Sequence, residues 1–214
     1  MKNSLILAAL ALLIALPVGA ATNPFDGKAV ALDAGHGAAD TGATGYCGET
    51  AVREVDVNLA VRAELGELLR ANGASVYDVP QLDSRRNRVA AAEEAGADVL
   101  ISIHHNGSSN TSADYTQSFV TQKNDKEFAK HIHPALVAAL DLPDRGIKSD
   151  GYGMTVYGSL PGILTEAYFI TNTAAACDFL GPRLRITAEA QALYDGLTAY
   201  FSRSVSGGGK GRNQ

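Results

Sequence analysis

Cysteine is scarce in this sequence, which contains only Cys47 and Cys177 in 214 residues. Two cysteines are too few for the disulfide framework that holds small secreted domains together. Basic residues are also outnumbered, because 18 Lys and Arg face 23 Asp and Glu and leave a net charge of −5. An acidic chain without a basic stripe is a poor binder of nucleic acid, so we expect no nucleic-acid partner.

Long apolar stretches are equally rare. The one extended run, Leu5–Leu16, is shorter than the roughly 20 residues that a membrane-spanning helix needs. Lys2 precedes this run, and small residues follow it as far as Ala20 and Ala21, which predicts a secretory signal peptide over residues 1–20. No cysteine lies near the cleavage point, which argues against a lipid anchor. We therefore expect an exported protein, periplasmic or secreted, with no membrane anchor after signal cleavage.

The rest of the chain has the composition of an ordinary globular protein, with 46% hydrophobic and 19% charged residues. At roughly 150 residues per domain, the length favours a single domain, which we expect over residues 21–204. Residues 205–214 are rich in glycine and are predicted to form a flexible tail. Apolar runs of strand length alternate with helical periodicity, which predicts an α/β fold with a mostly parallel sheet and helices on both faces.

The positions of the elements follow from the apolar pattern. Strands are predicted at 28–33, 74–79, 98–104, 115–121, 154–157 and 162–169. Helices are predicted from about 54 to 72, at 85–95, from about 124 to 140, shortly after 172, and at 187–201. Ser84 is expected to cap the second helix, and the segment from Asn124 to Glu127 resembles a capping box for the third.

Four polar residues lie near the ends of these elements. His36 lies between two glycines just after the first strand, and Glu54 lies where the first long helix begins. His104 is near the end of its strand, and Glu166 lies within an apolar strand, where a carboxylate is costly unless it is paired or bound to a metal. Sites in α/β sheets form at the carboxyl ends of strands, where these residues fall.

The residue types suggest a catalytic metal. Two histidines and one glutamate, with a fourth position left for water, form the ligand set of a catalytic zinc ion. A further acid that is not a ligand must then accept the proton of the water, and Glu166 fits that role. Each ligand candidate also has a structural explanation: a loop residue for His36, a hydrogen-bonded core histidine for His104, and a helix-start carboxylate for Glu54. The residues alone leave both interpretations open.

Four segments add a resemblance to a known family: Leu32–Ala43, Glu54–Leu59, Ala97–Asn106 and Pro161–Asn172. In this order they are similar to the motifs DAGHGGxDxGA, EKDVNL, ADxxxSIHAN and PxxLVExGFxSN of the type-3 family of zinc-dependent N-acetylmuramoyl-L-alanine amidases, which cleave bacterial peptidoglycan. The stretch Arg145–Lys148 also resembles a family segment. The resemblance covers about residues 28–200, nearly the whole chain after the signal peptide.

This resemblance implies that His36, Glu54 and His104 bind Zn2+ and that Glu166 is the catalytic carboxylate. It implies a sheet of about six strands and, as substrate, the amide bond between N-acetylmuramic acid and the L-alanine of the stem peptide. Peptidoglycan would then be the partner of the protein, in the periplasm or at the cell wall. Some family members carry a helical insertion between the last two motifs that plugs the zinc until an activator removes it. A strand, one helix, a loop and a strand account for this segment here, so we expect a monomer that needs no activator protein.

Two other functions remain compatible with these residues. A zinc carboxypeptidase or endopeptidase acting on the stem peptide would use the same ligands and the same base. A carboxypeptidase would also need a cation to hold the carboxylate of its substrate, for which the candidates are Arg85, Arg86, Arg88 and Arg145. The second alternative is a catalytically dead wall-binding module, and the presence of Glu166 argues against it.

The sequence departs from the family motifs at three places. His105 stands where the family has Ala, and alternation directs its side chain away from His104, so we interpret it as a polar neighbour and not as a fourth ligand. Ala167–Tyr168 replaces a small residue and a glycine and is expected to narrow the floor of the site. The segment Gly42–Gly48 is slightly expanded and contains Cys47, so the loop that carries the glutamate ligand is expected to differ.

The two cysteines have more than one interpretation. An exported chain meets an oxidising compartment, where a pair of cysteines can form a disulfide. Cys47 precedes Glu54 and Cys177 follows Glu166, so both are expected to leave the same rim of the sheet. A disulfide between them and two unpaired thiols are both compatible with the sequence. Thiolate ligation of the zinc is less favoured, because the cluster already leaves the open position that catalysis needs.

Overall fold

The structure, a computed structural model, describes residues 23–37, 39–149 and 153–206 of the chain. The predicted signal peptide, residues 1–20, lies outside the described residues, as do residues 207–214 of the predicted tail. The described part folds into a six-stranded sheet, a two-stranded hairpin and surrounding helices. None of the helices in this part is long and apolar enough to cross a lipid bilayer.

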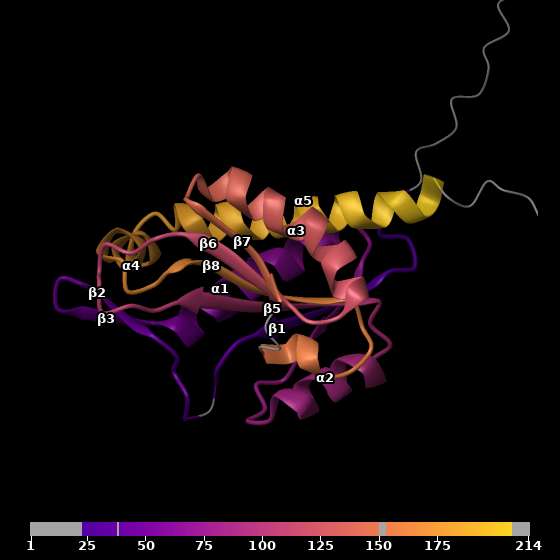
Figure 1. Ribbon diagram of the computed structural model, residues 1–214, viewed down its shortest axis with the longest axis horizontal. Coiled ribbons are helices and arrows are strands. Elements are labelled where there is room, and N and C mark those ends of the chain that lie inside the picture. The colour runs from indigo at the N-terminus through magenta and orange to yellow at the C-terminus, as the bar shows by residue number, and fades with distance from the viewer. Residues whose placement is uncertain (1–22, 38, 150–152, 207–214) are drawn as a thin grey trace, which may run out of the picture.

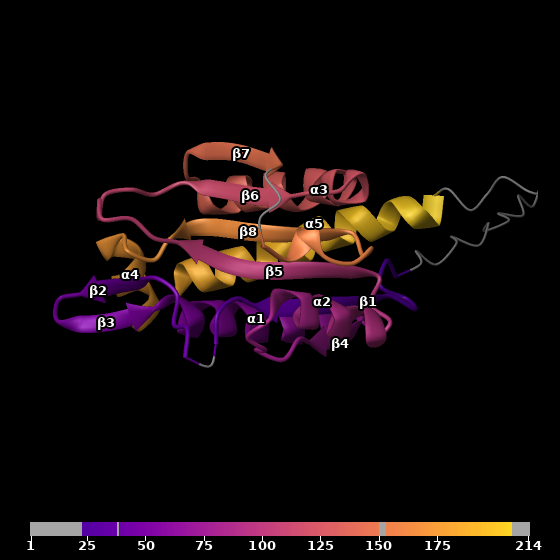
Figure 2. The same cartoon turned by 60° about the horizontal axis from the view of Figure 1, so that its bottom comes forward.

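The six-stranded sheet has the order β4-β1-β5-β8-β6-β7 and is parallel except for the antiparallel pair β6 and β8 (Figure 2). Its strands are β1 (Ala29–Ala34), β4 (Ser75–Asp78), β5 (Val99–Asn106), β6 (Thr116–Val120), β7 (Asp144–Ser149) and β8 (Gly162–Phe169). The central strands β1, β5 and β8 are nearly continuous apolar runs, because helices or loops cover both of their faces. The predicted α/β fold with a mostly parallel sheet is confirmed.

Helices cover the two faces of the sheet unequally (Figure 1). On one face α1, α3 and α5 build the larger core, which includes Leu32 and Ile101. On the other face α2 and a short 3-10 helix, η1, pack on a smaller cluster around Val89, Leu100 and Met154. The bounds are α1 (Glu54–Ala71), α2 (Arg85–Glu94), α3 (Lys123–Leu140), η1 (Gly153–Val156), α4 (Thr173–Leu180) and α5 (Leu184–Ser206).

The helix ends show which capping predictions hold. Ser84 caps α2 as predicted, since its side chain accepts a hydrogen bond from the backbone N–H of Asn87. The capping box of α3 is formed by Gln122 and Asp125, so the prediction of Asn124 and Glu127 is wrong by two residues. The sequence pattern missed it because Gln is an uncommon cap and the Asp lies in the place that Glu usually takes.

The sixth strand is not the one that the sequence predicts. Residues 154–157 were expected to form a strand, but Gly153–Val156 is the 3-10 helix η1, so that prediction is wrong. The sheet is completed instead by β7, which pairs with β6 at the edge and is exposed over most of its length. An exposed edge strand needs no apolar alternation, which is why the sequence pattern did not indicate it.

A β-bulge interrupts the pairing of the two strands at the centre of the sheet. His104 pairs with Glu166, whereas Asn106 pairs with Phe169, so β8 carries one extra residue. Beyond the bulge, Tyr168 is buried on the face covered by α5, with its ring centroid 4.3 Å from that of His105. The expectation that Tyr168 narrows the floor of the site is therefore wrong, because the bulge reverses the face to which its side chain points.

A disulfide joins the expanded loop to the C-terminal part of the chain. The loop is a hairpin of β2 (Thr44–Cys47) and β3 (Thr50–Arg53) that leads directly into α1. The Sγ atoms of Cys47 and Cys177 are 2.02 Å apart, and their Cα atoms are 4.8 Å apart. Of the alternatives left open by the sequence, the structure has the bridge. It ties the hairpin to α4, which packs on β2.

Candidate metal centre and active site

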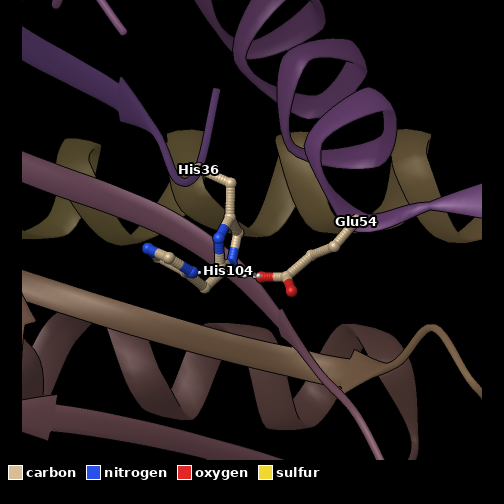
Figure 3. A group of neighbouring side chains, drawn as sticks. All are labelled: His36, Glu54 and His104. Carbon is tan, nitrogen blue, oxygen red and sulfur yellow. Dashed lines mark hydrogen bonds and ion pairs between the residues drawn. The ribbon is translucent and has the colours of Figure 1, made fainter. Parts of the chain in front are cut away.

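Three of the four predicted site residues meet at the carboxyl ends of the parallel strands (Figure 3). His36 lies in the turn after β1, Glu54 is the first residue of α1, and His104 lies in β5. Each side chain offers one ligand atom, and these atoms all lie within 4.8 Å of one another. The sheet order explains why the three side chains converge. β1 and β5 are neighbouring parallel strands, and the hairpin of β2 and β3 places the start of α1 at their carboxyl ends.

The carboxylate of Glu54 is the meeting point of the cluster. Its Oε1 lies 2.9 Å from Nε2 of His36 and 3.0 Å from Nδ1 of His104. Its Oε2 accepts a hydrogen bond from the backbone N–H of Ala43 at 2.9 Å. Two imidazole nitrogens and one carboxylate oxygen therefore lie close together. Nitrogen and oxygen atoms of these side chains are ligands that zinc prefers.

Glycines provide the room for this convergence. A Cβ at Gly35 would lie 2.2 Å from the ring of His104, and a Cβ at Gly42 would lie 2.5 Å from Oε2 of Glu54. His36 itself has φ of 66°, a left-handed conformation that is uncommon outside glycine. Such backbone strain persists only where the surrounding structure enforces it, as it often does at functional sites.

Asp40 orients the first histidine. Its Oδ2 lies 2.8 Å from Nδ1 of His36, and its Oδ1 accepts a hydrogen bond from the backbone N–H of Gly42. Because Nδ1 of His36 faces Asp40, Nε2 is the nitrogen directed at Glu54, and it is the atom that could bind a metal in place of its proton. A carboxylate behind a histidine is the usual way in which proteins fix the tautomer of a metal ligand.

The pKa values of the cluster reflect its packing. Burial raises the pKa of Glu54, but hydrogen bonds from His104 and His36 outweigh burial and hold that pKa well below its usual range. The hydrogen bond with Glu54 raises the pKa of His36 to about 9, against the effect of burial. An ionised carboxylate between two imidazoles is a site where a divalent cation can take the place of protons.

Glu166 is the fourth predicted residue and lies beside the cluster. It pairs with His104 across β5 and β8 and is half-buried. Its Oε2 is buried without a hydrogen-bond partner among the described residues. Burial, and next the charge of Glu54, raise the pKa of Glu166 to about 8. A buried acid that no structural contact accounts for is a candidate for proton transfer.

A cleft of about 470 Å³ contains all four residues. Asp40 and Asn106 also line it, and Met154 and Leu164 supply apolar wall. The cleft opens on the less covered face of the sheet, where α2 and η1 leave the carboxyl ends of the strands accessible. A carboxyl group with a raised pKa, beside side chains that can hold a metal ion, is typical of hydrolases that activate water.

Sequence reasoning missed one group of residues that holds the site together. Asp33 is buried and lies 3.0 Å from Nη1 of Arg88, and Ser102 donates to it at 2.7 Å. Arg88 also donates to the backbone carbonyls of Ala34 and His36. The available signal was Asp33 itself, a charged residue inside an apolar strand and two residues before the turn Gly35–Gly37.

The same contacts reduce the set of cations that could hold a substrate carboxylate. Arg88 is occupied by Asp33 and by backbone carbonyls. The guanidinium of Arg86 stacks over Tyr157, and that of Arg145 stacks over Tyr115. Of the four candidate arginines, only Arg85 and Arg88 line the cleft.

Ser118, His133 and Asp144 are arranged like a catalytic triad, but the serine is not accessible to a substrate. Nδ1 of His133 lies 2.9 Å from Oγ of Ser118, and Nε2 lies 2.9 Å from Oδ1 of Asp144. Ser118 is fully buried and does not line the cleft. We therefore interpret this trio as a structural link between α3, β6 and β7.

Comparisons with known proteins identify the family of the chain. The family described as N-acetylmuramoyl-L-alanine amidase matches residues 30–199. The uncharacterized protein YqiI of Bacillus subtilis is 35% identical over 207 residues, which cover 94% of this chain and 98% of YqiI. The N-acetylmuramoyl-L-alanine amidase LytC of Bacillus subtilis is 34% identical over 186 residues, which cover 84% of this chain and 36% of LytC.

A solved structure extends the comparison to the fold. The catalytic domain of CwlV, an N-acetylmuramoyl-L-alanine amidase from Bacillus (Paenibacillus) polymyxa var. colistinus, matches with a TM-score of 0.72 and 29% identity. The match covers 81% of this chain and 97% of the CwlV domain. The protein is thus a cell-wall hydrolase by class. It belongs to the family of N-acetylmuramoyl-L-alanine amidases.

Proposed function

We propose that this protein is a zinc-dependent peptidoglycan amidase that cleaves the bond between N-acetylmuramic acid and the L-alanine of the stem peptide. The observation that carries the proposal is that Glu166, whose Oε2 has no hydrogen-bond partner among the described residues, shares one cleft with the converging side chains of His36, Glu54 and His104. Membership of the amidase family supports the bond that is cut.

The three converging residues fit a zinc ion. Nε2 of His36, Nδ1 of His104 and Oε1 of Glu54 would provide the three protein ligands that a catalytic zinc ion needs. Zinc, when bound there, supplies a Lewis acid that polarises the amide carbonyl and makes water more acidic. Asp40 holds the tautomer of His36, and Ala43 holds the second carboxylate oxygen of Glu54.

Glu166 moves the proton. Its carboxylate accepts a proton from the attacking water and delivers that proton to the nitrogen of L-alanine as the amide bond breaks. The raised pKa of about 8 keeps this acid close to the range in which it can both accept and donate near neutral pH. The positive charge of a bound metal would lower that pKa toward neutrality.

We also propose that the protein is exported and acts in the periplasm or at the cell wall. The apolar N-terminal pattern over residues 1–20 supports a signal peptide, with residues 21–204 forming the catalytic domain. The disulfide between Cys47 and Cys177 supports an oxidising compartment. We propose a monomer that acts without an activator, because the part of the segment from 107 to 160 that the structure describes is accounted for by β6, α3, β7 and η1. An inert purified protein that a partner switches on would contradict this last point.

Digestion of purified sacculi tests the proposed function. The protein from residue 21 onward is incubated with sacculi in the presence of zinc, in the presence of a chelator, and as the variant Glu166→Gln. We expect new N-terminal L-alanine amines with zinc only, and a strongly reduced yield from the variant. Release of a C-terminal amino acid, or cleavage within the stem peptide, would identify the alternative carboxypeptidase or endopeptidase. No zinc-dependent release of either end would refute the proposal.

A further inference from the structure

A buried histidine lies behind the candidate metal centre and has no role in the proposed reaction. His105 follows His104 in β5, but it is 1% exposed and its side chain contacts helices on the opposite face of the sheet. Its Nε2 lies 2.9 Å from Oε2 of Glu189 in α5, and its Nδ1 lies 2.7 Å from Oδ1 of Asn58 in α1. One imidazole therefore joins two helices beneath the cluster.

The contacts of His105 extend to the cluster itself. Asn58 uses its Nδ2 to donate to the backbone carbonyl of Gly35 at 3.1 Å, and Gly35 is the residue before His36. The backbone N–H of His105 donates to Oε1 of Glu54 at 3.1 Å. The third member of the cluster precedes His105 in the chain. His105 is thus linked to all three members of the cluster. Its imidazole reaches the residue before His36 through Asn58, its backbone N–H contacts Glu54, and its peptide bond joins it to His104.

The hydrogen bond to Gly35 sets the direction of the one between Asn58 and His105. Because Nδ2 of Asn58 donates to Gly35, the amide oxygen of Asn58 faces His105 and accepts from its Nδ1. Removing the imidazole would leave the Asn58 amide free to rotate. The carbonyl that it holds belongs to the turn in which His36 adopts its left-handed φ, a conformation that requires support from its surroundings.

Stability alone does not explain the pairing of His105 with Glu189. Glu189 is fully buried, and its Oε1 has no hydrogen-bond partner among the described residues. Burying a carboxylate is costly, and a buried charged pair is often no more stable than apolar side chains of similar volume. A carboxylate in this position is better explained by the orientation that it gives to the His105 ring.

Two departures from the family motifs form one packed unit here. His105 replaces the alanine of one motif and Tyr168 replaces the glycine of another, and their ring centroids are 4.3 Å apart. The extra residue in β8 turns Tyr168 toward His105. The guanidinium of Arg185 in α5 lies over the Tyr168 ring, 5.1 Å from its centroid. The tyrosine closes the space around the imidazole and restricts it to the orientation that reaches Asn58 and Glu189.

We propose that His105, oriented by Glu189, is a positioning residue of the metal centre. Its imidazole holds Asn58, and through Asn58 the turn that carries His36, in the arrangement that receives a divalent ion. This inference rests on the proposed function, since it concerns the same metal centre.

A matched pair of histidine variants tests the inference. His105→Ala and His133→Ala each remove a buried imidazole with two side-chain hydrogen-bond partners, but the partners of His133, Ser118 and Asp144, do not belong to the cluster. Zinc dissociation constants are measured by competition with a chromogenic chelator, and the visible absorption spectrum is recorded after loading with Co2+. Stability of the metal-free proteins is measured by urea unfolding. We expect both variants to lose stability.

Only the His105 variant should weaken metal binding. We expect its zinc dissociation constant to rise by roughly 10- to 100-fold, the usual effect of removing a residue that supports a metal ligand, with an altered Co2+ spectrum. Glu189→Gln, which keeps the imidazole and the packing, should change both in the same direction by less. If His105→Ala does not fold, Glu189→Gln decides the question. Unchanged zinc affinity and an unchanged Co2+ spectrum in the folded variant would overturn the inference.

The wild-type protein separates this failure from failure of the proposed function. A wild type that binds zinc and releases L-alanine amines, with variants that bind zinc equally well, would refute only the positioning role of His105. A wild type that binds no zinc would refute both.

Discussion

Cys47 and Cys177 are joined by a disulfide across 130 residues of sequence, and the bridge ties the hairpin that leads into Glu54 to the helix that follows β8. The bridge thus restrains Glu54, a proposed metal ligand, from outside the cleft. Gly45, two residues before Cys47 in β2, has no room for a Cβ, which would lie 1.9 Å from the carbonyl oxygen of Ile170. The hairpin therefore packs closely on the segment between β8 and α4.

Removal of this bridge should cost stability. Closing so long a loop is worth about 5 kcal/mol in the chain-entropy model, and measured values are usually lower, about 2 to 4 kcal/mol. We expect Cys47→Ala combined with Cys177→Ala to lower the free energy of unfolding by that smaller amount in urea titrations. Reductant should destabilise the wild type and leave the double variant unchanged. Equal stability of oxidised wild type and double variant would contradict the prediction.

Loss of a ligand and loss of the acid should have different effects. His36→Ala and His104→Ala should lose zinc, activity and the part of the stability that bound metal supplies. Glu166→Gln should keep zinc and lose about two to four orders of magnitude in rate, the usual contribution of a proton-transfer group. Metal content by mass spectrometry and rates on sacculi measure the two effects. A zinc-free Glu166→Gln protein would mean that Glu166 is a ligand.

The raised pKa of Glu166 predicts how stability depends on pH in the metal-free protein. Its pKa is about 8 in the folded state and has an ordinary value of 4.5, so between these values the folded protein holds one proton that the unfolded chain has released. This group therefore lowers the free energy of unfolding by about 1.4 kcal/mol for each pH unit as the pH rises through that window.

Glu166→Gln removes this dependence. In chelator, the variant should gain stability relative to the wild type as the pH rises from about 5 to about 8, and the gain should disappear at lower pH. The raised pKa of His36 contributes to the pH dependence of both proteins, so the comparison removes most of its effect. Unfolding curves collected across the window check the difference, and curves that stay parallel at every pH would show that Glu166 ionises normally.

Arg88 should prove essential to the turn that carries His36. It is the cation beside the buried Asp33 and donates to two carbonyls around the turn. Arg88→Met leaves that carboxylate buried without its cation, so we expect a loss of about 3 to 5 kcal/mol in unfolding experiments. Arg86→Met is the matched control, because that exposed guanidinium only stacks over Tyr157 and should contribute below about 1 kcal/mol. A similar small loss in both variants would be the contrary result.

Alanine variants of Gly42 and Gly48 distinguish the effect of crowding at the candidate metal centre from the effect of backbone strain. Both have a positive φ, but a Cβ at Gly42 would lie 2.5 Å from Oε2 of Glu54 and 2.6 Å from the ring of His36, whereas a Cβ at Gly48 meets nothing within 4 Å. Each Ala variant should lose about 1 kcal/mol or more through strain. Only Gly42→Ala should also weaken zinc binding, which chelator competition measures. Equal zinc affinity in the two variants would show that the cluster tolerates the extra carbon.

Much of this molecule follows from short-range sequence patterns. The apolar run 162–169 predicts β8 at its observed bounds, and Ser84 predicts the start of α2. Polar residues inside or beside apolar strands, such as His104 and Glu166, indicate a site because burial of unpaired polar groups is costly. The parallel order of strands then brings their carboxyl ends together. The residues by themselves left structural roles open, and the resemblance to the amidase family implied the roles of the four site residues.

Tertiary structure decided what depends on contacts between distant segments. The exposed edge strand β7 has no apolar pattern to reveal it, and one extra residue in β8 turned Tyr168 away from the cleft. The partner of His105 is Glu189, 84 residues later, and neither residue predicts the other. A local pattern records which face a side chain must bury, because burial depends on periodicity along one element. It does not record which distant side chain fills that face, because this is fixed only when helices and strands pack together.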